Sequence, residues 1–189
     1  LRLGETTDTQ DAAGRLLASI DPRGITEGDL QAVLTGFRGI QRQLPPMYSA
    51  VKVGGQRLYK AARAGKTIDR AERSIVIHAL ELMSFDGRDA TLRVVCSKGT
   101  YVRTLCADIG QALGVGGHLS ALERRRVGPL SIERALTVEQ VASHLEAKTL
   151  ADVPAGTRER ILKASAFITR VAGRVGVVSG SRPSARIGG

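Results

Sequence analysis

The sequence predicts an α+β chain, in which helices alternate with strands that pair antiparallel. Two stretches, residues 27–37 and 100–113, carry apolar side chains at helical spacing. Two others, residues 74–85 and 90–97, are rich in strand-forming residue types, and Asp86-Gly87-Arg88-Asp89 between them is typical of a hairpin connection. A chain of 189 residues with 42% hydrophobic content can bury enough apolar surface to form one hydrophobic core, so one main domain is expected.

The first predicted helix, residues 27–37, begins at a capping signal. Thr26 precedes it and Asp29 lies three residues further on, which resembles a capping box. The apolar side chains that follow recur at helical spacing, at Leu30, Val33, Leu34 and Phe37. We expect this helix to be scaffold.

A strand, a turn and a short helix are predicted next. Tyr48 to Val53 is interpreted as a strand that ends at Gly54-Gly55. Arg57 to Ala64 is interpreted as a helix that ends at Gly65, because glycine readily adopts the left-handed conformation that often terminates a helix. Three residues with candidate roles belong to this unit: Tyr48, Lys52 and Tyr59.

The second long helix follows a strand directly. Its apolar pattern starts after Thr100 and stops at Gly114, so residues 98–103 lie where a strand leads into a helix N-terminus. Such a junction offers backbone N–H groups and the positive end of the helix dipole to an anion.

The C-terminal part of the chain is less regular. Leu119 to Ile132 is predicted as a final strand pair, Thr137 to Leu145 as a helix, and Arg158 to Thr169 as a further helix. We therefore divide the chain into a domain over residues 1–146 and a basic, weakly ordered tail over residues 147–189. The tail has no recognisable C-terminal RNA-binding domain, and a frame-shifted sequence is an alternative explanation for it.

The charge balance favours a polyanionic partner. The formal net charge is +10, and more than half of the excess lies beyond residue 146. Lysines and arginines that neutralise phosphates release counterions and so gain affinity for nucleic acid without reading its sequence. With no Trp and only 3% aromatic residues, the chain is excluded as a platform that stacks many bases.

Metal and membrane functions find no support in the sequence. Cys96 and Cys106 lack a second pair that would complete a zinc site, so reduced structural thiols are expected. The three histidines show no metal-binding spacing. No apolar run is long enough to cross a bilayer, so a cytoplasmic location is expected.

Several short blocks carry a family resemblance. The two most specific are Pro45-Pro46-Met47-Tyr48-Ser49-Ala50-Val51-Lys52 and Ser97-Lys98-Gly99-Thr100-Tyr101-Val102-Arg103-Thr104. Leu58-Tyr59 belongs with the first of these blocks, and the similarity continues through residues 7–14, 37–39 and 118–128. Over about residues 1–140 the chain resembles the TruB family of bacterial tRNA pseudouridine synthases, which isomerise one uridine in the T loop of tRNA.

The resemblance implies a fold, an activity and a set of partners. The fold would be α+β, a mixed and mainly antiparallel sheet flanked by helices, of which this chain supplies a part. The activity would be that of an isomerase that acts on the T stem-loop of tRNA without cofactor or metal. We expect such a protein to be monomeric at full length and to have no membrane association.

The family's nucleophilic aspartate lies upstream of the Thr7-Asp8-Thr9 loop, in a segment of the Gly-Thr-Leu-Asp-Pro type. Because the chain starts at Leu1, only a few residues before that loop, we expect it to be a fragment that is inactive alone. The alternative function is a non-catalytic module that binds or helps to fold tRNA. A basic structural protein of the ribosomal type would explain the charge but not the block around Arg103.

The resemblance also implies residue roles. Arg103 matches the arginine that pairs with the catalytic aspartate, and a planar guanidinium suits a carboxylate. Tyr101 matches a tyrosine that contacts the target uridine, and Leu122 matches a leucine that packs the base. An apolar wall beside the flipped ring would exclude water from the carboxylate and the arginine.

Further residues are candidates for contact with RNA. Lys52 and Lys98 would each meet a phosphate, and Tyr48 and Tyr59 would brace the pocket. The run Arg124-Arg125-Arg126 has two open interpretations, RNA contact or a strand edge kept soluble by charge.

Other positions are assigned no catalytic part. Asp8 and Asp11 are expected to shape their loop and to take no part in catalysis. Glu123 and Leu130 depart from the family pattern, so RNA affinity is expected to be weaker there.

Overall fold

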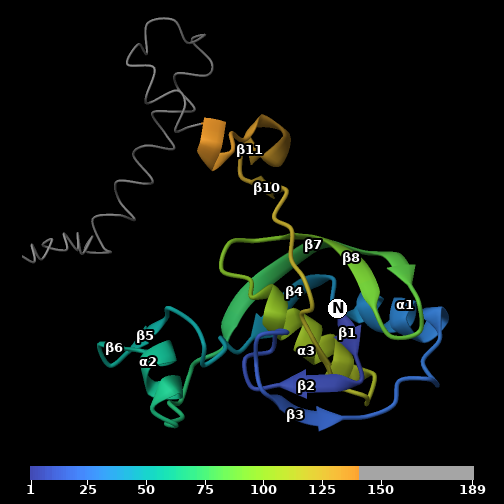
Figure 1. The fold of residues 1–189 in the computed structure, drawn as a ribbon, viewed down its shortest axis with the longest axis horizontal. Coiled ribbons are helices and arrows are strands. Elements are labelled where there is room, and N and C mark those ends of the chain that lie inside the picture. The colour runs from blue at the N-terminus through green and yellow to red at the C-terminus, as the bar shows by residue number, and fades with distance from the viewer. Residues whose placement is uncertain (141–189) are drawn as a thin grey trace, which may run out of the picture. The chain divides into compact units, whose positions relative to one another are not determined.

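The computed structural model describes residues 1–140 (Figure 1). These residues belong to two compact units, Leu1–Glu123 and the part that starts at Arg124, and each is described by itself. The predicted tail over residues 147–189 and the predicted helix at Arg158 to Thr169 lie outside the described residues.

A three-stranded antiparallel sheet forms the backbone of the first unit. Its order is β4 (Gly39–Gln43), β7 (Arg73–Phe85), β8 (Ala90–Cys96), so the predicted hairpin is confirmed. Gly87 has a φ of +96° at the turn, which a side chain would strain. The register between β7 and β8 shifts between Ile77 and Ala79, and this bulge moves the next buried side chain by one residue.

Two helices, α1 (Glu27–Gly36) and α3 (Val102–Ala112), pack with the sheet around one core. The predicted capping box is present, because Thr26 Oγ1 accepts the N–H of Asp29 and the Asp29 carboxylate accepts the N–H of Thr26. The core is made of aliphatic side chains from both helices and from the sheet, among them Leu30, Leu34, Ile75, Ile77, Leu80, Leu105 and Ile109. This arrangement is the α+β fold expected from the sequence.

The N-terminal strands lie against α3 (Figure 1). β1 (Arg2–Leu3) pairs with β9 (Gly117–His118), and β2 (Glu5–Thr7) pairs with β3 (Leu16–Ser19). A Cβ at Gly110 of α3 would overlap the backbone of residues 116 and 117, so only glycine permits this close approach.

The β2–β3 loop is tied to the residue that follows β9. The N–H of Leu119 donates to the carbonyl of Gln10 at 3.0 Å, and the N–H of Ala12 donates to the carbonyl of Leu119 at 2.9 Å. These bonds hold the β2–β3 loop beside the segment that follows β9.

A small segment departs from the predicted bounds. β5 (Lys52–Val53) and β6 (Gln56–Arg57) form a two-residue ladder that leads into α2 (Leu58–Arg63). The predicted strand from Tyr48 is wrong over residues 48–51, because the N–H of Ser49 bonds to the carbonyl of Met47 and bends the chain after Pro45-Pro46. The closing Gly65 is confirmed, with a φ of +68°.

The second unit is described only over residues 124–140. It contains β10 (Arg126–Val127), β11 (Leu130–Ser131) and a short 3₁₀ helix (Ile132–Arg134). The predicted strand pair over Leu119 to Ile132 is therefore much shorter than expected, because Leu119 gives its backbone bonds to the β2–β3 loop.

The next predicted helix is described only at its start. Thr137 Oγ1 accepts the N–H of Gln140, as its predicted opening requires, and the rest of that helix lies outside the described residues. Across residues 1–140, no helix combines the length and the apolar character that a membrane span requires.

Candidate active site around Arg103

Arg103 is the second residue of α3, just beyond the turn that ends β8. Thr100 Oγ1 donates to the carbonyl of Ser97 at 2.9 Å, and Gly99 takes a φ of +89°, which redirects the chain from strand to helix. Tyr101 is the N-cap of α3, and its own N–H donates to Gln43 Oε1 at 2.8 Å. The predicted junction of strand and helix is confirmed, but this N–H is already bonded within the protein.

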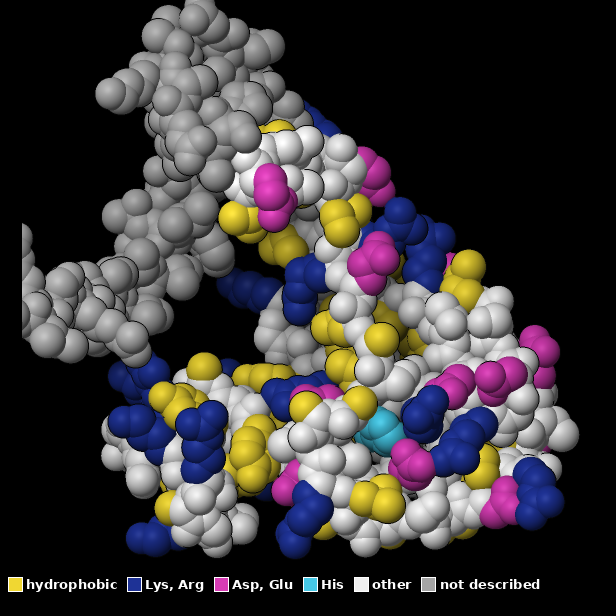
Figure 2. Space-filling view, in the orientation of Figure 1, with side chains coloured by type: hydrophobic (Ala, Val, Ile, Leu, Met, Phe, Trp, Pro, Cys, Tyr) yellow, Lys and Arg dark blue, Asp and Glu magenta, His cyan; other side chains and the backbone are white. Residues whose placement is uncertain are grey.

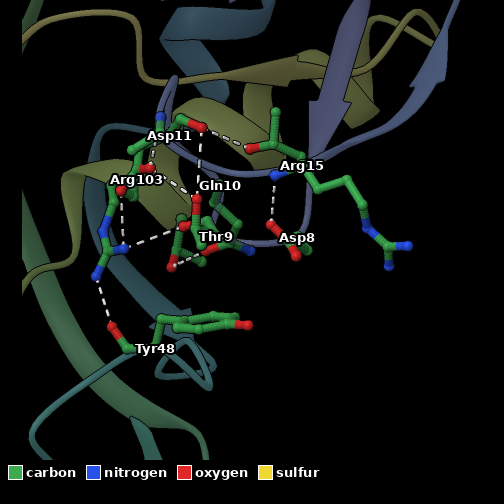
Figure 3. Close-up of polar contacts among 10 residues, drawn as sticks. Asp8, Thr9, Gln10, Asp11, Arg15, Tyr48 and Arg103 are labelled. Carbon is green, nitrogen blue, oxygen red and sulfur yellow. Dashed lines mark hydrogen bonds and ion pairs between the residues drawn. The ribbon is translucent and has the colours of Figure 1, made fainter. Parts of the chain in front are cut away.

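The guanidinium of Arg103 joins three segments of the chain (Figure 3). Nη1 donates to the carbonyl of Thr9 at 3.1 Å and forms an ion pair with Asp11 Oδ2 at 3.0 Å. Nη2 donates to the carbonyl of Tyr48 at 2.7 Å. The side chains of Arg103 and Asp11 are each 26% exposed, so the pair is shielded from water without being sealed.

The expected loop-shaping role of the two aspartates is confirmed. Asp8 Oδ1 accepts the N–H of Arg15 at 2.9 Å (Figure 3). Asp11 Oδ1 accepts the Thr9 hydroxyl at 2.7 Å and the N–H of Ala13 at 3.1 Å.

Asp11 has a second role that the sequence interpretation missed, because its other oxygen pairs with Arg103. Burial alone would raise the pKa of Asp11. The hydrogen bonds from Thr9 and Ala13, together with the bond and charge of Arg103, outweigh burial and lower that pKa.

The guanidinium retains donors for a further partner. Among residues 1–140, neither Nε–H nor the second N–H of Nη2 of Arg103 has a hydrogen-bond partner. Nε and Nη2 share one edge of the guanidinium, the edge that can receive a carboxylate side-on with two hydrogen bonds. Arg103 is thus anchored by its Nη groups and can still bind another anion.

The loop opposite Arg103 is held by a second contact with α3. Gln10 is the one residue other than glycine in the described chain with a positive φ, at 62°. Its Oε1 accepts the hydroxyl of Thr104 at 2.8 Å, and Thr104 is buried. The left-handed residue is therefore stabilised by α3, which also carries Arg103.

The other predicted residues lie at different distances from this cluster. Tyr101 is half-buried two residues before Arg103, and Lys98 is exposed in the turn after β8. Leu122 is 54% exposed in a segment without regular secondary structure. The structure brings Tyr48 to Arg103 through its backbone carbonyl.

Lys52 and Tyr59 lie together in the β5–β6–α2 segment, defined here as residues 52–63. With Lys60 and Arg57 they line a groove of about 810 Å³. The hydrogen bond from Arg57 to the Tyr59 hydroxyl, at 3.4 Å, is the main cause that lowers the pKa of Tyr59. Figure 2 shows Lys and Arg side chains gathered over this segment, at lower left.

The described chain offers no obvious metal centre. Within residues 1–140, no three His, Cys, Asp or Glu side chains come together as a metal site would require. Both cysteines are free thiols, and burial raises the pKa of Cys106 to about 11. A thiol with that pKa stays protonated at neutral pH and is not reactive.

Comparison with known families places the chain. The model of the TruB family pseudouridylate synthase N-terminal domain matches residues 1–102, and that of the tRNA pseudouridylate synthase B C-terminal domain matches residues 103–162. The second match extends beyond residue 146, where we predicted a domain boundary. That boundary stays a prediction.

The curated relatives that match are called tRNA pseudouridine synthase B. The protein of Pseudomonas aeruginosa UCBPP-PA14 is 52% identical over 141 residues, which are 74% of this chain and 45% of that protein. The protein of Bordetella avium 197N is 45% identical over 162 residues, 82% of this chain and 66% of that protein. The chain thus spans between about half and two thirds of the length of these relatives.

Two solved structures share the fold. A Cbf5-Nop10-Gar1 complex matches with a TM-score of 0.56 and 30% identity, over 72% of this chain and 36% of the matched one. An H/ACA RNP bound to a substrate RNA containing 2'-deoxyuridine matches with a TM-score of 0.51 and 25% identity, over 72% and 35%. With the family models and the curated relatives, these matches establish that the chain belongs to the TruB family of pseudouridylate synthases.

Proposed function

We propose that the gene product carrying this chain is a tRNA pseudouridine synthase that isomerises a uridine in the T stem-loop, acting as a cytoplasmic monomer. The observation that carries the proposal is the Arg103 guanidinium. It lies in a family motif, is anchored by Asp11, Thr9 and Tyr48, and keeps an edge able to receive a carboxylate.

The reaction needs a carboxylate that is held ionised beside the sugar-base bond. The bond from the sugar to N1 breaks, a new bond forms from the sugar to C5 of the same base, the C5 hydrogen leaves as a proton and N1 takes up a proton, so no atom is gained or lost overall. We assign the nucleophilic carboxylate to an aspartate upstream of Leu1. Arg103 would keep it charged, because a nearby cation lowers a carboxyl pKa.

Asp11 is better suited to orient Arg103 than to act as the nucleophile. Its Oδ1 already accepts two hydrogen bonds and its Oδ2 receives the guanidinium. A carboxylate engaged in this way has little capacity left for attack on a sugar. We therefore propose that Asp11 is a positioning residue for Arg103.

The remaining predicted residues would handle the flipped base and the backbone. Tyr101 and Leu122 would pack the uracil ring, with Tyr48 bracing the pocket, since extruding a base from its stack must be offset by contacts in the site. Lys52, Tyr59 and Lys98 would meet phosphates and sugars of the stem-loop. The groove between Lys52 and Lys60 supports this assignment, because it collects positive charge on an exposed surface.

The proposal is tested on the complete gene product with a tRNA transcript that carries tritium at C5 of uridine. The new bond is made to C5, so isomerisation releases tritium to water. We expect release from wild type and none from Arg103→Ala. Tight tRNA binding without any tritium release would instead establish the alternative function, a module that binds or folds tRNA.

One analytical measurement precedes that assay. The intact mass and N-terminal sequence of the native protein show whether an aspartate-containing segment precedes Leu1. We expect such a segment, of the Gly-Thr-Leu-Asp-Pro type. A native protein that starts near Leu1 would leave the binding module as the better description.

A further inference from the structure

Gln43, the last residue of β4, makes a contact that neither the family motif nor the active-site cluster explains. It is 4% exposed although it is polar. Its Oε1 accepts the N–H of Tyr101 at 2.8 Å, and its Nε2 donates to the carbonyl of Tyr101 at 3.1 Å. Both ends of the amide are thus bonded to the backbone of a single residue, 58 positions away in the chain.

A carboxamide can make this contact because it carries a donor and an acceptor side by side. It pairs with the peptide groups of Tyr101 as a neighbouring strand would. The Tyr101 side chain makes no capping bond to α3, and the amide of Gln43 pairs with the backbone N–H of Tyr101 itself, at the start of the helix. Loss of the amide would leave this N–H unpaired in a partly buried position.

The contact fixes where α3 begins, and therefore where its first side chains lie. Tyr101 is the predicted uracil contact, and Arg103 follows it by two residues. The chain that leaves Gln43 reaches Tyr48 after five residues, and the carbonyl of Tyr48 accepts Arg103 Nη2. The end of β4 thus fixes the position of the helix that carries Arg103, and it leads directly into the segment whose Tyr48 carbonyl accepts a hydrogen bond from Arg103.

We propose that Gln43 is a positioning residue for the isomerisation, which acts by clamping the backbone of Tyr101 so that Tyr101 and Arg103 face the substrate in a fixed register. The inference rests on the proposed function for its catalytic meaning. The clamp itself can be tested without that function.

The kinetic test compares Gln43→Met with Gln41→Met in the complete gene product. Methionine matches glutamine in length but removes both hydrogen bonds. Gln41 lies on the same strand and bonds to the carbonyls of Gly36 and Arg38, away from Tyr101, so it provides a matched control. The measurements are single-turnover tritium release and the Kd for tRNA.

For Gln43→Met we expect release to slow by about tenfold, as loss of one or two hydrogen bonds would give, with the Kd within about twofold of wild type. Gln41→Met should leave both within about twofold. A Gln43→Met rate equal to wild type, or an equal fall in Gln41→Met, would overturn the proposal.

The second test reads the clamp directly, by hydrogen exchange at the Tyr101 amide. We expect faster exchange in Gln43→Met and unchanged exchange in Gln41→Met, and equal protection in all three proteins would refute the clamp. A wild type that exchanges as expected but releases no tritium would instead refute the proposed function alone.

A third variant, Gln43→Glu, covers the case in which Gln43→Met does not fold. A protonated carboxyl restores a donor and an acceptor, whereas a carboxylate only accepts. Because position 43 is buried, the pKa of this carboxyl should lie above its ordinary value of about 4.3, so the rate of Gln43→Glu relative to wild type should rise as the pH is lowered from about 8 to about 5.5. A flat ratio across that range would show that the amide does not act as a clamp.

Discussion

The Arg103 cluster and the β5–β6–α2 segment differ in how their side chains are held and in the charge that they expose. The hydrogen bonds of Arg103 and of Thr104 join parts of the chain far apart in sequence, and most donors and acceptors around Arg103 are paired. Residues 52–63 are mostly exposed, pair only with near neighbours and carry four basic side chains without an acidic one. The first region holds its side chains in fixed positions, and the second exposes a positively charged surface.

This difference shows how one chain can combine exact chemistry with adaptable binding. A group that stabilises charge in a reaction is most effective when its surroundings hold it still. A surface that attracts phosphates depends on positive charge and little on geometry. We therefore expect changes in the first region to alter the rate, and changes in the second to alter affinity and its salt dependence.

Among the conservative substitutions, the largest effect is expected from Arg103→Lys. Lysine keeps the charge but cannot reach Asp11, Thr9 and Tyr48 at once, and it loses the side-on edge. Tritium release should fall by at least about 100-fold, the size found when a preorganised electrostatic contact is removed. Binding of tRNA, measured by filter retention, should change by less than about threefold. If Arg103→Lys instead weakens tRNA binding more than it slows tritium release, the two regions do not differ in the way proposed.

A smaller fall in rate is expected from Asp11→Asn. The amide can keep the bonds of Oδ1 to Thr9 and Ala13 but loses the charge that holds Arg103. A hydrogen bond between charged groups contributes about 1.5–3 kcal/mol, so the rate should fall by roughly tenfold to 100-fold. Asp8→Asn provides the matched control in the same loop, and a similar loss there would mean that only the loop shape matters.

The same pair should make stability depend on pH in a defined direction. The pKa of Asp11 is lowered in the folded protein, so its contribution to the free energy of unfolding is present above its unfolded value of about 3.9. That contribution is lost as the pH falls through the folded value. Urea unfolding of wild type and Asp11→Asn should differ at pH 6, and the difference should shrink progressively as the pH falls below about 4 and through the folded value; a difference that does not shrink at low pH would refute the link.

The β5–β6–α2 segment should respond in affinity. The triple variant Arg57→Gln, Lys60→Gln, Arg63→Gln should weaken tRNA binding by about tenfold and reduce the slope of log affinity against log salt by about 2. The single-turnover rate at saturating tRNA should stay within about threefold of wild type.

The control for that experiment removes the same charge elsewhere, with Arg23→Gln, Arg42→Gln and Arg93→Gln. These arginines are exposed and already paired with Asp21, Glu72 and Glu81. An equal loss of affinity in the control would mean that net charge alone attracts the RNA.

The smallest effect is expected at Ser49, one residue after Tyr48. Its hydroxyl is buried, and it is the one buried side-chain donor in the described chain without a hydrogen-bond partner. Replacement by alanine removes a group that gains nothing from burial, so the free energy of unfolding should change by less than about 1 kcal/mol. A large destabilisation, measured by urea unfolding, would show that the hydroxyl has a partner after all.

Sequence reasoning was accurate where the signal is local. The helix over residues 27–36, its cap at Thr26 and the β7–β8 hairpin all follow from periodicity and turn chemistry over short distances. The junction before Arg103 was found in the same way. The strand predicted from Tyr48 was wrong over residues 48–51, because the chain bends there after two prolines although its residue types favour a strand.

The site was predicted as a set of residues but not as an arrangement. Asp11 lies in a block that resembles the family, but its ion-pair partner, Arg103, lies 92 residues further on. Rules based on neighbouring residues predict only that such an aspartate bonds within its own loop. Gln43 gave no signal, since a glutamine at a strand end is usually solvated. Its role depends on packing that brings β4 against the start of α3.

The separation between Arg103 and its loop has a consequence for synthesis on the ribosome. Thr9 and Arg103 are 94 residues apart. At about 5–20 residues per second, the loop is made roughly 5 to 20 s before the arginine that completes it. During that interval the nascent chain holds Asp11 without its cation, and translation past α3 sets the earliest time at which the cluster can close.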